Sequence, residues 1–248
     1  MTKLSNKEIL QITQSQLSLD LNCAPADFNK EGIIFCESKD NPGRRPFPRG
    51  ERHFDMLTMG KAIIVSATTD ILPYLQEQLK GKSRDDAFCM PFVYGSGIYF
   101  LPDHLDPLPT PAGHNFEFTE GTDIHKLYSL EGFHNAIQYD ANHPRPDVLV
   151  LLAKKEGKII GMAGASDDCK MLWQIGIDVL PEYRNGGIAA ALTSQLALEI
   201  LARGKIPYYG TATSNVASQR VAFRAGFKPA WLCVYRGIFD GELVKTTV

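Results

Sequence analysis

The chain has 248 residues, which suits one large domain or two small ones with a hydrophobic core. A hydrophobic content of 44% and a charged content of 22% are typical of a globular protein, and a net charge of −2 offers no electrostatic footprint for nucleic acid. The five cysteines are dispersed without any C-x-x-C pair, which argues against disulfides and zinc. With no secretory signal and no apolar run of about 20 residues, we expect a cytoplasmic protein without a metal, a nucleic-acid partner or a membrane contact.

The first hundred residues give weaker signals than the rest of the chain. Ile9, Ile12 and Leu17 recur at helical spacing. Two strands, a helix and a glycine-interrupted strand are expected further along, at residues 54–65, 69–79 and 92–100. We interpret this region as a smaller α/β N-terminal domain, and its β-β-α order leaves open a degenerate copy of the fold of the second half.

A basic, proline-rich loop lies within this region. It reads Asn41-Pro-Gly-Arg-Arg-Pro-Phe-Pro-Arg-Gly50. We expect a solvated surface loop, because such composition is typical of exposed connections. The alternative is an arginine contact to a phosphate or to an acidic group of a substrate.

A second proline-rich segment, at residues 101–113, separates the two halves of the chain. Its prolines at positions 102, 107, 109 and 111 lack backbone donors and favour extended backbone, so we expect a connector. It sets the predicted domains at residues 1–113 and 114–248.

The second half alternates strand and helix signals. A short strand at 116–118 precedes a segment expected to be helical in two pieces, 122–139. Strands are expected next on either side of a hairpin turn at Glu156-Gly157, and a further strand, with Gly176 as a bulge or a close backbone approach, ends at Val179. The remaining elements are a helix, a strand, a helix capped by Asn215 and stopped at Gly226, and a strand, at residues 187–202, 208–212, 215–226 and 228–236.

The turn between the strand ending at Val179 and the helix after it is the most informative feature. It contains Arg184-Asn-Gly-Gly-Ile-Ala189. The first N–H groups of a helix lack intrahelical partners, and the helix dipole adds positive potential. We expect Gly186 and Gly187 to adopt positive φ and to let a phosphate approach the backbone. The pattern matches neither a dinucleotide fingerprint nor an NTPase loop.

A second block follows the loop in sequence. A strand at Tyr208–Ala212 leads to Asn215-Val-Ala-Ser218 and then to Gly226-Phe227. The R-x-x-G-x-A loop and this N-x-x-S…G-F block together resemble the GNAT (N-acetyltransferase) superfamily over about residues 115–240. The resemblance implies a GNAT fold, a mixed α/β sheet, in the C-terminal half, and acetyl-CoA as the cofactor.

The resemblance also implies roles for particular residues. The loop would hold the CoA pyrophosphate, the strand before it would bind the pantetheine arm through backbone groups, and a backbone N–H near Val179 would stabilise the oxyanion. The helix-start asparagine and the small residue after it would contact the arm. The expected cofactor-binding residues are Ile177, Val179, Arg184, Asn185, Gly186, Gly187, Ile188, Ala189, Asn215 and Ser218.

The catalytic groups match the family less well. Many relatives have a proton-donating tyrosine four residues before the glycine of G-F, where this chain has Ala222. Asp178 lies in the strand that would face the cofactor, and we expect it to act as the general base, through water. The alternative is an aspartate satisfied by neighbouring backbone groups.

These features predict an acetyl-CoA-dependent N-acetyltransferase that acts on a primary amine of a small molecule or an amino-acid-like acceptor. Two alternatives stay open: a GNAT-like sensor or scaffold that binds acyl-CoA without turnover, and a protein or peptide N-acetyltransferase. A homodimer is compatible with the sequence, which does not determine the oligomeric state.

Overall fold

The computed structural model describes residues 4–239 and 242–245. Contacts within it divide the chain into two compact units, each described by itself below. Unit 1 comprises Met1–Ile9, Phe100–Gly210 and Asn215–Lys228, and unit 2 comprises Leu10–Tyr99, Thr211–Ser214 and Pro229–Val248. Both units mix helices and strands, which confirms the α/β class. Each unit is defined by its contacts and combines several segments of the chain, so it does not test whether a segment folds independently. The domain boundary at residue 113 therefore stays a prediction.

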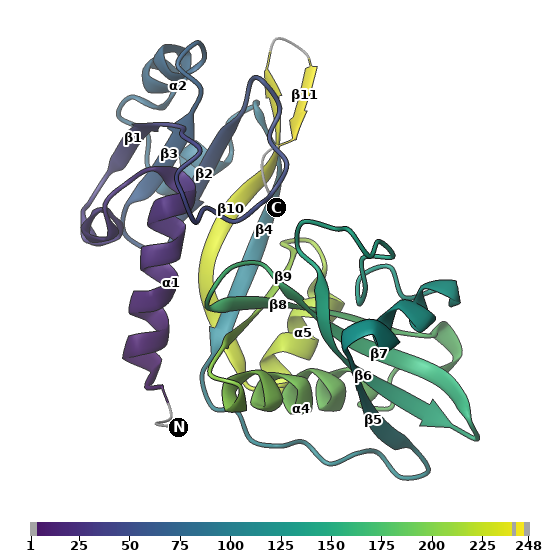
Figure 1. The fold of residues 1–248 in the computed structure, drawn as a ribbon. Coiled ribbons are helices and arrows are strands. Elements are labelled where there is room, and N and C mark those ends of the chain that lie inside the picture. Colours follow the sequence, from purple (N-terminus) through teal and green to yellow (C-terminus); the bar gives the residue numbers. More distant parts are fainter. Residues whose placement is uncertain (1–3, 240–241, 246–248) are drawn as a thin grey trace. The chain divides into compact units, whose positions relative to one another are not determined.

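Unit 1 is built on a mixed sheet in the order β9-β8-β7-β6-β5 (Figure 1). Neighbouring strands are antiparallel except for β8 and β9, which are parallel. Glu156 and Gly157 close the β6–β7 hairpin with φ of 50° and 80°, as tight hairpin turns require. The bounds are β5 (Asn115–Glu120), β6 (Asp147–Lys155), β7 (Lys158–Asp167), β8 (Leu172–Val179) and β9 (Ile206–Ala212).

Helix α4 (Ile188–Ala202) covers one face of this sheet, packing on β6, β7 and β8 (Figure 1). Ile188, Leu192, Leu196 and Ile200 are all buried, one turn apart along the helix. This spacing places them on a single face toward the sheet, as the sequence pattern predicted.

The other face of the sheet is packed against the turn at residues 133–137. A Cβ on Gly164 would lie 1.8 Å from Ala136 O, and one on Gly176 would lie 1.7 Å from Asn135 O. Only glycine permits this approach. Because β7 and β8 keep a continuous register through Gly176, close approach and not a bulge explains that glycine.

The helical prediction for residues 122–139 is wrong in its second part. A 3-10 helix, η2 (Gly121–Ser129), covers the first part, and turns follow it. Gly132 and Tyr139 have φ of 92° and 59°, which no continuous helix accepts. The carboxylate of Asp178 also takes two backbone N–H groups of this segment that a helix would use itself.

Helix α5 (Val216–Arg224) starts and stops as predicted. The Asn215 side chain accepts the Ser218 N–H at 3.1 Å, and Gly226 ends the helix with φ of 91°. The Gly226 carbonyl also accepts the N–H of Asp103 at 3.0 Å. The helix stop therefore anchors the start of the proline-rich connector.

The connector itself is bound to α4. Ser194 Oγ donates to Asp106 O at 2.7 Å and accepts the Leu108 N–H at 3.2 Å. Gln195 Nε2 donates to Leu108 O at 2.8 Å. This proline-rich segment therefore satisfies its backbone groups with helix side chains in place of a strand partner.

Unit 2 contains a second group of strands, in the order β1-β3-β2-β10-β4, with β11 on β10 (Figure 1). β1 and β3 are parallel, whereas β2 is antiparallel to β3 and to β10. The sequence did not predict β1 or β11. The bounds are β1 (Ile33–Glu37), β2 (Phe54–Thr58), β3 (Ile63–Ala67), β4 (Val93–Pro102), β10 (Phe227–Phe239) and β11 (Glu242–Lys245).

The helices of the first hundred residues are α1 (Asn6–Leu21), a 3-10 turn η1 (Pro25–Asn29), α2 (Leu72–Leu79) and α3 (Arg84–Phe88). α2 and β2–β3 share an apolar core. Every residue of β2 and β3 is buried, so these strands show no alternation of apolar and polar residues. The two strands and α2 were predicted, whereas the short α3 was not.

The loop at residues 41–50 is not the solvated surface loop that its composition predicted. Arg45 is buried, and its Nε donates to Asp20 Oδ2 at 2.6 Å. Arg49 Nη2 donates to Asp55 Oδ2 at 3.0 Å, with both side chains less than a tenth exposed. Two aspartates outside the loop therefore draw its arginines inward, and loop composition alone could not show this.

Three features of the described residues bear on protein class. None of the helices within 4–239 and 242–245 is long and apolar enough to cross a membrane. In the same residues, no cluster of three or more His, Cys, Asp and Glu side chains could hold a metal ion. All five cysteines are free.

Candidate active site

The last four residues of β8 extend beyond its pairing with β9. The final parallel pair is Ile175 with Tyr209, whereas β8 continues to Val179 and stays paired with β7 along its other side. We call residues 176–179 the open edge of β8. On the β9 side, these residues have no strand partner in the part of the chain that the structure describes.

The backbone groups of Ile177 and Val179 point to this open edge. Met171 O bonds to β9, and the Leu180 N–H bonds to β7. Alternate residues of a strand turn their backbone groups to opposite sides, so the odd-numbered residues of β8 face away from β7. A ligand lying along the open edge would therefore meet the N–H and C=O groups of these two residues.

The loop after β8 is held in place by Arg184. A short 3-10 turn, η3 (Pro181–Tyr183), leads into it, and Arg184 Nε donates back to Val179 O at 2.9 Å. No other hydrogen bond of this guanidinium reaches a described residue. Arg184 therefore fixes the loop against the end of the strand and keeps its terminal nitrogens available.

Two residues of the loop adopt left-handed backbone. Gly187 does so as expected, with φ of 80°, but the second is Asn185, with φ of 66°, and not Gly186. Asparagine tolerates this region better than other side chains do. A Cβ on Gly186 would meet only Tyr183 O at 3.9 Å, and one on Gly187 would meet nothing within 4 Å. Both glycines therefore border open space.

A row of backbone donors results from this conformation. The Arg184 N–H bonds to Pro181 O, and the next bonded amide in the chain is that of Ala191, to Gly187 O. The N–H groups of residues 185–190 thus lack partners within the described residues. Together with the dipole of α4, they form a site for a phosphate or another anion.

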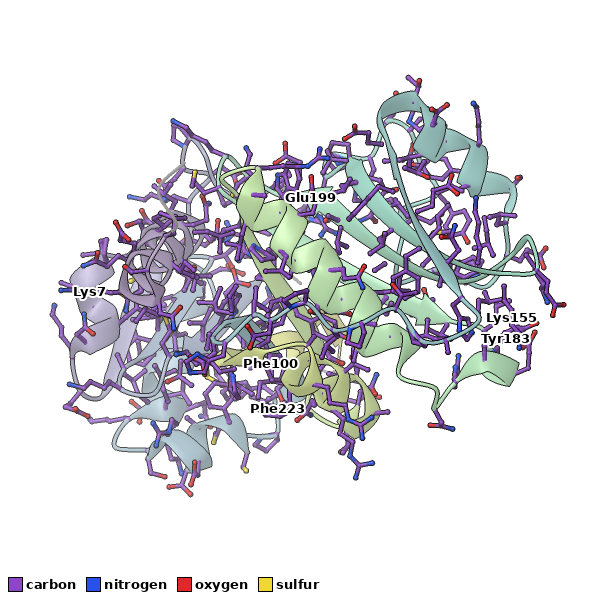
Figure 2. The ribbon with its side chains drawn as sticks, turned by 90° about the horizontal axis from the view of Figure 1, so that it is seen from below. Lys7, Phe100, Lys155, Tyr183, Glu199 and Phe223 are labelled. Atoms are coloured by element: carbon purple, nitrogen blue, oxygen red, sulfur yellow. The ribbon has the colours of Figure 1, made fainter. Side chains whose placement is uncertain are left out.

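Lysines line the side of this loop. Lys158 Nζ lies 5.5 Å from the centre of the Tyr183 ring, and Lys155 Nζ lies 5.9 Å from it, as Figure 2 shows for Lys155 and Tyr183. Lys158 also contacts Glu182 Oε1 at 3.4 Å. These cations add positive potential beside the row of N–H groups.

The start of α5 presents two further predicted residues. Asn215 uses Oδ1 as the helix cap, so its role as a plain N-cap is confirmed, while any contact with a ligand stays a prediction. Ser218 Oγ lies 2.7 Å from the hydroxyl of Tyr209 on β9. This contact joins α5 to the residue at which β8–β9 pairing ends.

Asp178 is occupied by the turn that packs on Gly176. Its carboxylate accepts the Asn135 N–H at 2.7 Å, the Asn135 Nδ2 group at 2.6 Å and the Ala136 N–H at 3.1 Å. All three donors belong to residues of the turn at 133–137. The carboxylate therefore holds the turn, and its expected role as a base stays a prediction.

The structure brings the predicted binding residues 177, 179 and 184–189 together at one end of β8, all within unit 1. It also adds Asn135 and Ala136, which sequence reasoning missed. The only sequence signal for them was Gly176, whose lack of a side chain indicated a close neighbour without naming it.

The fold and the donor row define an α/β domain in which a helix N-terminus presents N–H groups without described partners. A family model, "Acetyltransferase (GNAT) family", matches residues 115–227. Residues 115–227 therefore form a domain of the GNAT family. No curated protein matches the chain.

Solved structures similar to this chain include three of interest. A GNAT-family protein from Novosphingobium aromaticivorans is 20% identical, with a TM-score of 0.42, over 62% of this chain and 66% of its own, just under two thirds. A Salmonella typhimurium protein solved with its cofactor acetyl-CoA is 18% identical, with a TM-score of 0.39, over 55% and 94%. A tandem GNAT protein from the clavulanic acid biosynthesis pathway is 15% identical, with a TM-score of 0.44, over 67% and 59%. These values are too low to carry ligands or acceptors over to this chain.

Proposed function

We propose that this protein transfers an acetyl group from acetyl-CoA to a primary amine of a small molecule or an amino-acid-like acceptor. The observation that carries the proposal is the row of N–H groups at residues 185–190, placed at the end of the open edge of β8 in a GNAT domain. This arrangement offers a diphosphate at one end and an extended, amide-containing arm along the strand.

The cofactor would be held in three parts. The pyrophosphate accepts hydrogen bonds from residues 185–190, with the terminal nitrogens of Arg184 and the two lysines at its side. The pantetheine amides bond to the backbone groups of Ile177 and Val179, where a β9 strand partner would otherwise bind. Asn215 and Ser218 contact the arm from α5. These contacts leave the thioester near the start of the open edge.

Transfer then needs a neutral amine beside the thioester carbonyl. The nitrogen attacks the carbonyl carbon, and the N–C bond forms as the C=O electron pair moves to oxygen. A backbone N–H of the open edge of β8 stabilises that oxyanion. Collapse breaks the C–S bond, the electron pair leaves on sulfur, and the nitrogen loses its proton to solvent or to a base.

The experiment for this function pairs two measurements. Thiol release from acetyl-CoA is followed over a panel of small amines, amino acids and peptides, and CoA binding is measured directly by calorimetry. Release with small amines supports the proposal, and release with peptides alone would indicate the protein or peptide alternative. Binding without release on any amine would indicate the sensor, which the absence of a hydroxyl at buried Ala222 motivates.

The loop assignment has its own test. Arg184→Ala together with Gly187→Asp should weaken CoA binding at least 100-fold, because a carboxylate would face the phosphates where N–H groups now lie. Gly113→Asp is the matched control, since Gly113 also has a positive φ, of 78°, with nothing within 4 Å of its Cβ position. Unchanged CoA affinity in the double variant would show that the loop is not the pyrophosphate site.

The role of Asp178 is tested by Asp178→Asn. If Asp178 positions the turn at 133–137, the variant lowers thermal stability while the pH–rate profile keeps its shape. If Asp178 is the general base, the acidic limb of the profile is lost instead. The three hydrogen bonds to its carboxylate favour the first outcome.

A further inference from the structure

A pair of hydroxyl groups lies where β8 and β9 separate. Tyr209 Oη and Ser218 Oγ are 2.7 Å apart, and the contact joins β9 to α5 within unit 1. Tyr209 is paired with Ile175, the residue just before the open edge of β8. The pair therefore sits at the start of the open edge, where the proposed function places the thioester.

Tyr209 is held rigidly in the core. Its side chain is buried, and its ring packs edge-on to Phe100 at 6.3 Å between ring centroids. Phe100 in turn packs edge-on to Phe223 of α5 at 5.5 Å, and Figure 2 shows this last pair side by side. Aromatic contacts on β4 and α5 thus fix the direction of the Tyr209 hydroxyl.

The burial also keeps this hydroxyl protonated. Desolvation is the main cause that raises the pKa of Tyr209 to about 12, and the nearby negative charge of Asp178 adds to it, although the Ser218 contact opposes the shift. A buried O–H needs an acceptor, and Ser218 Oγ is the hydrogen-bond partner that the described residues give it. The distance allows either hydroxyl to donate, and the need of the buried Tyr209 O–H for an acceptor assigns it as the donor.

Ser218 is the accessible member. Its side chain is half-buried, and its own N–H is fixed by the Asn215 cap at 3.1 Å. With Oγ accepting from Tyr209, the serine proton is free to point away from the core. Ala222, one helical turn further on, is buried and has no hydroxyl, so Ser218 is the hydroxyl that this part of α5 presents.

We propose that Ser218 donates a hydrogen bond to the sulfur of the departing CoA thiolate, and that Tyr209 is a positioning residue that orients it. This inference rests on the proposed function. When the C–S bond breaks, its electron pair stays on sulfur and the Ser218 O–H stabilises the new charge. Ser218 does not need to give up its proton, because the thiolate of a thiol with a pKa near 8.5 is a good enough leaving group by itself.

The direct test compares the affinity of CoA with that of desulfo-CoA, which lacks the thiol. In the unmodified protein, CoA should bind more tightly as the pH rises through the thiol pKa, because the thiolate accepts the stronger hydrogen bond. Ser218→Ala should remove this increase, whereas any loss in desulfo-CoA affinity, which reports the contact of Ser218 with the pantetheine arm, should not depend on pH. Ser218→Thr, which keeps the hydroxyl, should retain it.

Turnover gives the second readout. Ser218→Ala should lower kcat about 10- to 100-fold, the range expected for one hydrogen bond to a charged group, and this loss should exceed the change in the KM for acetyl-CoA. Tyr209→Phe should lower kcat less, and the double variant should be no worse than Ser218→Ala, because Tyr209 acts through the serine. Ser214→Ala, which removes an exposed hydroxyl nearby, is the control.

The outcomes separate the two proposals. If the unmodified protein neither binds CoA nor releases thiol, the proposed function fails. If it does both and Ser218→Ala matches it in kcat and in pH-dependent CoA affinity, the function stands and the hydroxyl pair only packs β9 against α5. Additive losses in the double variant would likewise remove Tyr209 from a role through Ser218.

Discussion

Two loops of this protein have compositions that suit an anion site. One leaves its backbone hydrogen-bond donors without described partners, whereas the other pairs its donors with aspartates of the protein itself. The loop at 184–189 has one arginine and leaves the N–H groups of residues 185–190 without described partners. The loop at 41–50 has three arginines, yet Arg45 and Arg49 have side chains buried against Asp20 and Asp55. Among the fully buried side-chain nitrogens of this loop that the structure describes, Nε of Arg49 alone lacks a hydrogen-bond partner. A count of cations therefore does not identify an anion site, whereas unpaired donors at open space do.

The comparison predicts its largest effect in the loop at 41–50. Arg45→Ala should lower the free energy of unfolding by about 3–5 kcal/mol, because it leaves Asp20 buried without its charged partner. Urea denaturation measures this loss, and CoA affinity at a temperature where the variant is folded should not change. Lys39→Ala, which removes an exposed pair at 3.7 Å from Glu37, should cost under about 1 kcal/mol. Equal losses in the two variants would contradict the structural role of Arg45.

The next effect concerns pH. Burial is the main cause that raises the pKa of Cys233 to about 12, with the negative charge of Asp55 adding to it. The thiol ionises more readily once unfolded, near its ordinary value of 9.0. Its contribution is thus complete below pH 9 and is lost as the pH rises toward 12, by about 2 kcal/mol at pH 10.5.

This dependence is checked by urea denaturation between pH 8 and about 10.5. Cys233→Ala starts from a lower stability, since it removes a buried side chain, but its stability should fall less steeply with pH than that of the unmodified protein. Parallel curves for the two proteins would remove Cys233 as the cause.

The next substitution, with a smaller expected effect, tests the loop at 184–189. Gly186 has no positive φ, so Gly186→Ala should leave the stability of the protein unchanged. Its new methyl group faces the space where a phosphate would approach the backbone, and CoA affinity should fall about tenfold, or about 1.4 kcal/mol. A loss of stability with full CoA affinity would place the ligand elsewhere.

The smallest effect is electrostatic. Lys158→Ala should weaken CoA binding about two- to threefold. The difference in affinity from the unmodified protein should shrink as salt is added, because salt screens the attraction between an exposed cation and a phosphate. Titrations at two salt concentrations measure this. A salt-independent loss would indicate a direct contact between Lys158 and the ligand.

The sequence was sufficient where a signal was local. The caps of α5 at Asn215 and Gly226, the β6–β7 hairpin and the loop before α4 each depend on a few adjacent residues with known backbone preferences. The motifs that predict a GNAT domain are local in the same way, and the family match at residues 115–227 confirms that prediction.

Long-range pairing could not be read from the sequence. The burial of Arg45 depends on Asp20, which lies 25 positions earlier, and the turn at 133–137 depends on Asp178 more than 40 positions later. In both cases a carboxylate far along the chain takes backbone or guanidinium donors that local rules assign elsewhere. Strand β1 was not predicted for a similar reason. Its short sequence gives a weak strand signal, and its parallel pairing with β3 stabilises it.

The binding of the proline-rich segment to α4 has a consequence for proteolysis. A protease must take its substrate in extended form with free backbone groups, yet Asp106 and Leu108 give theirs to Ser194 and Gln195. Cleavage in this segment therefore requires these hydrogen bonds to open first. The rate of nicking would then measure the local opening of this segment away from α4, in a stretch whose prolines suggest a simple exposed linker.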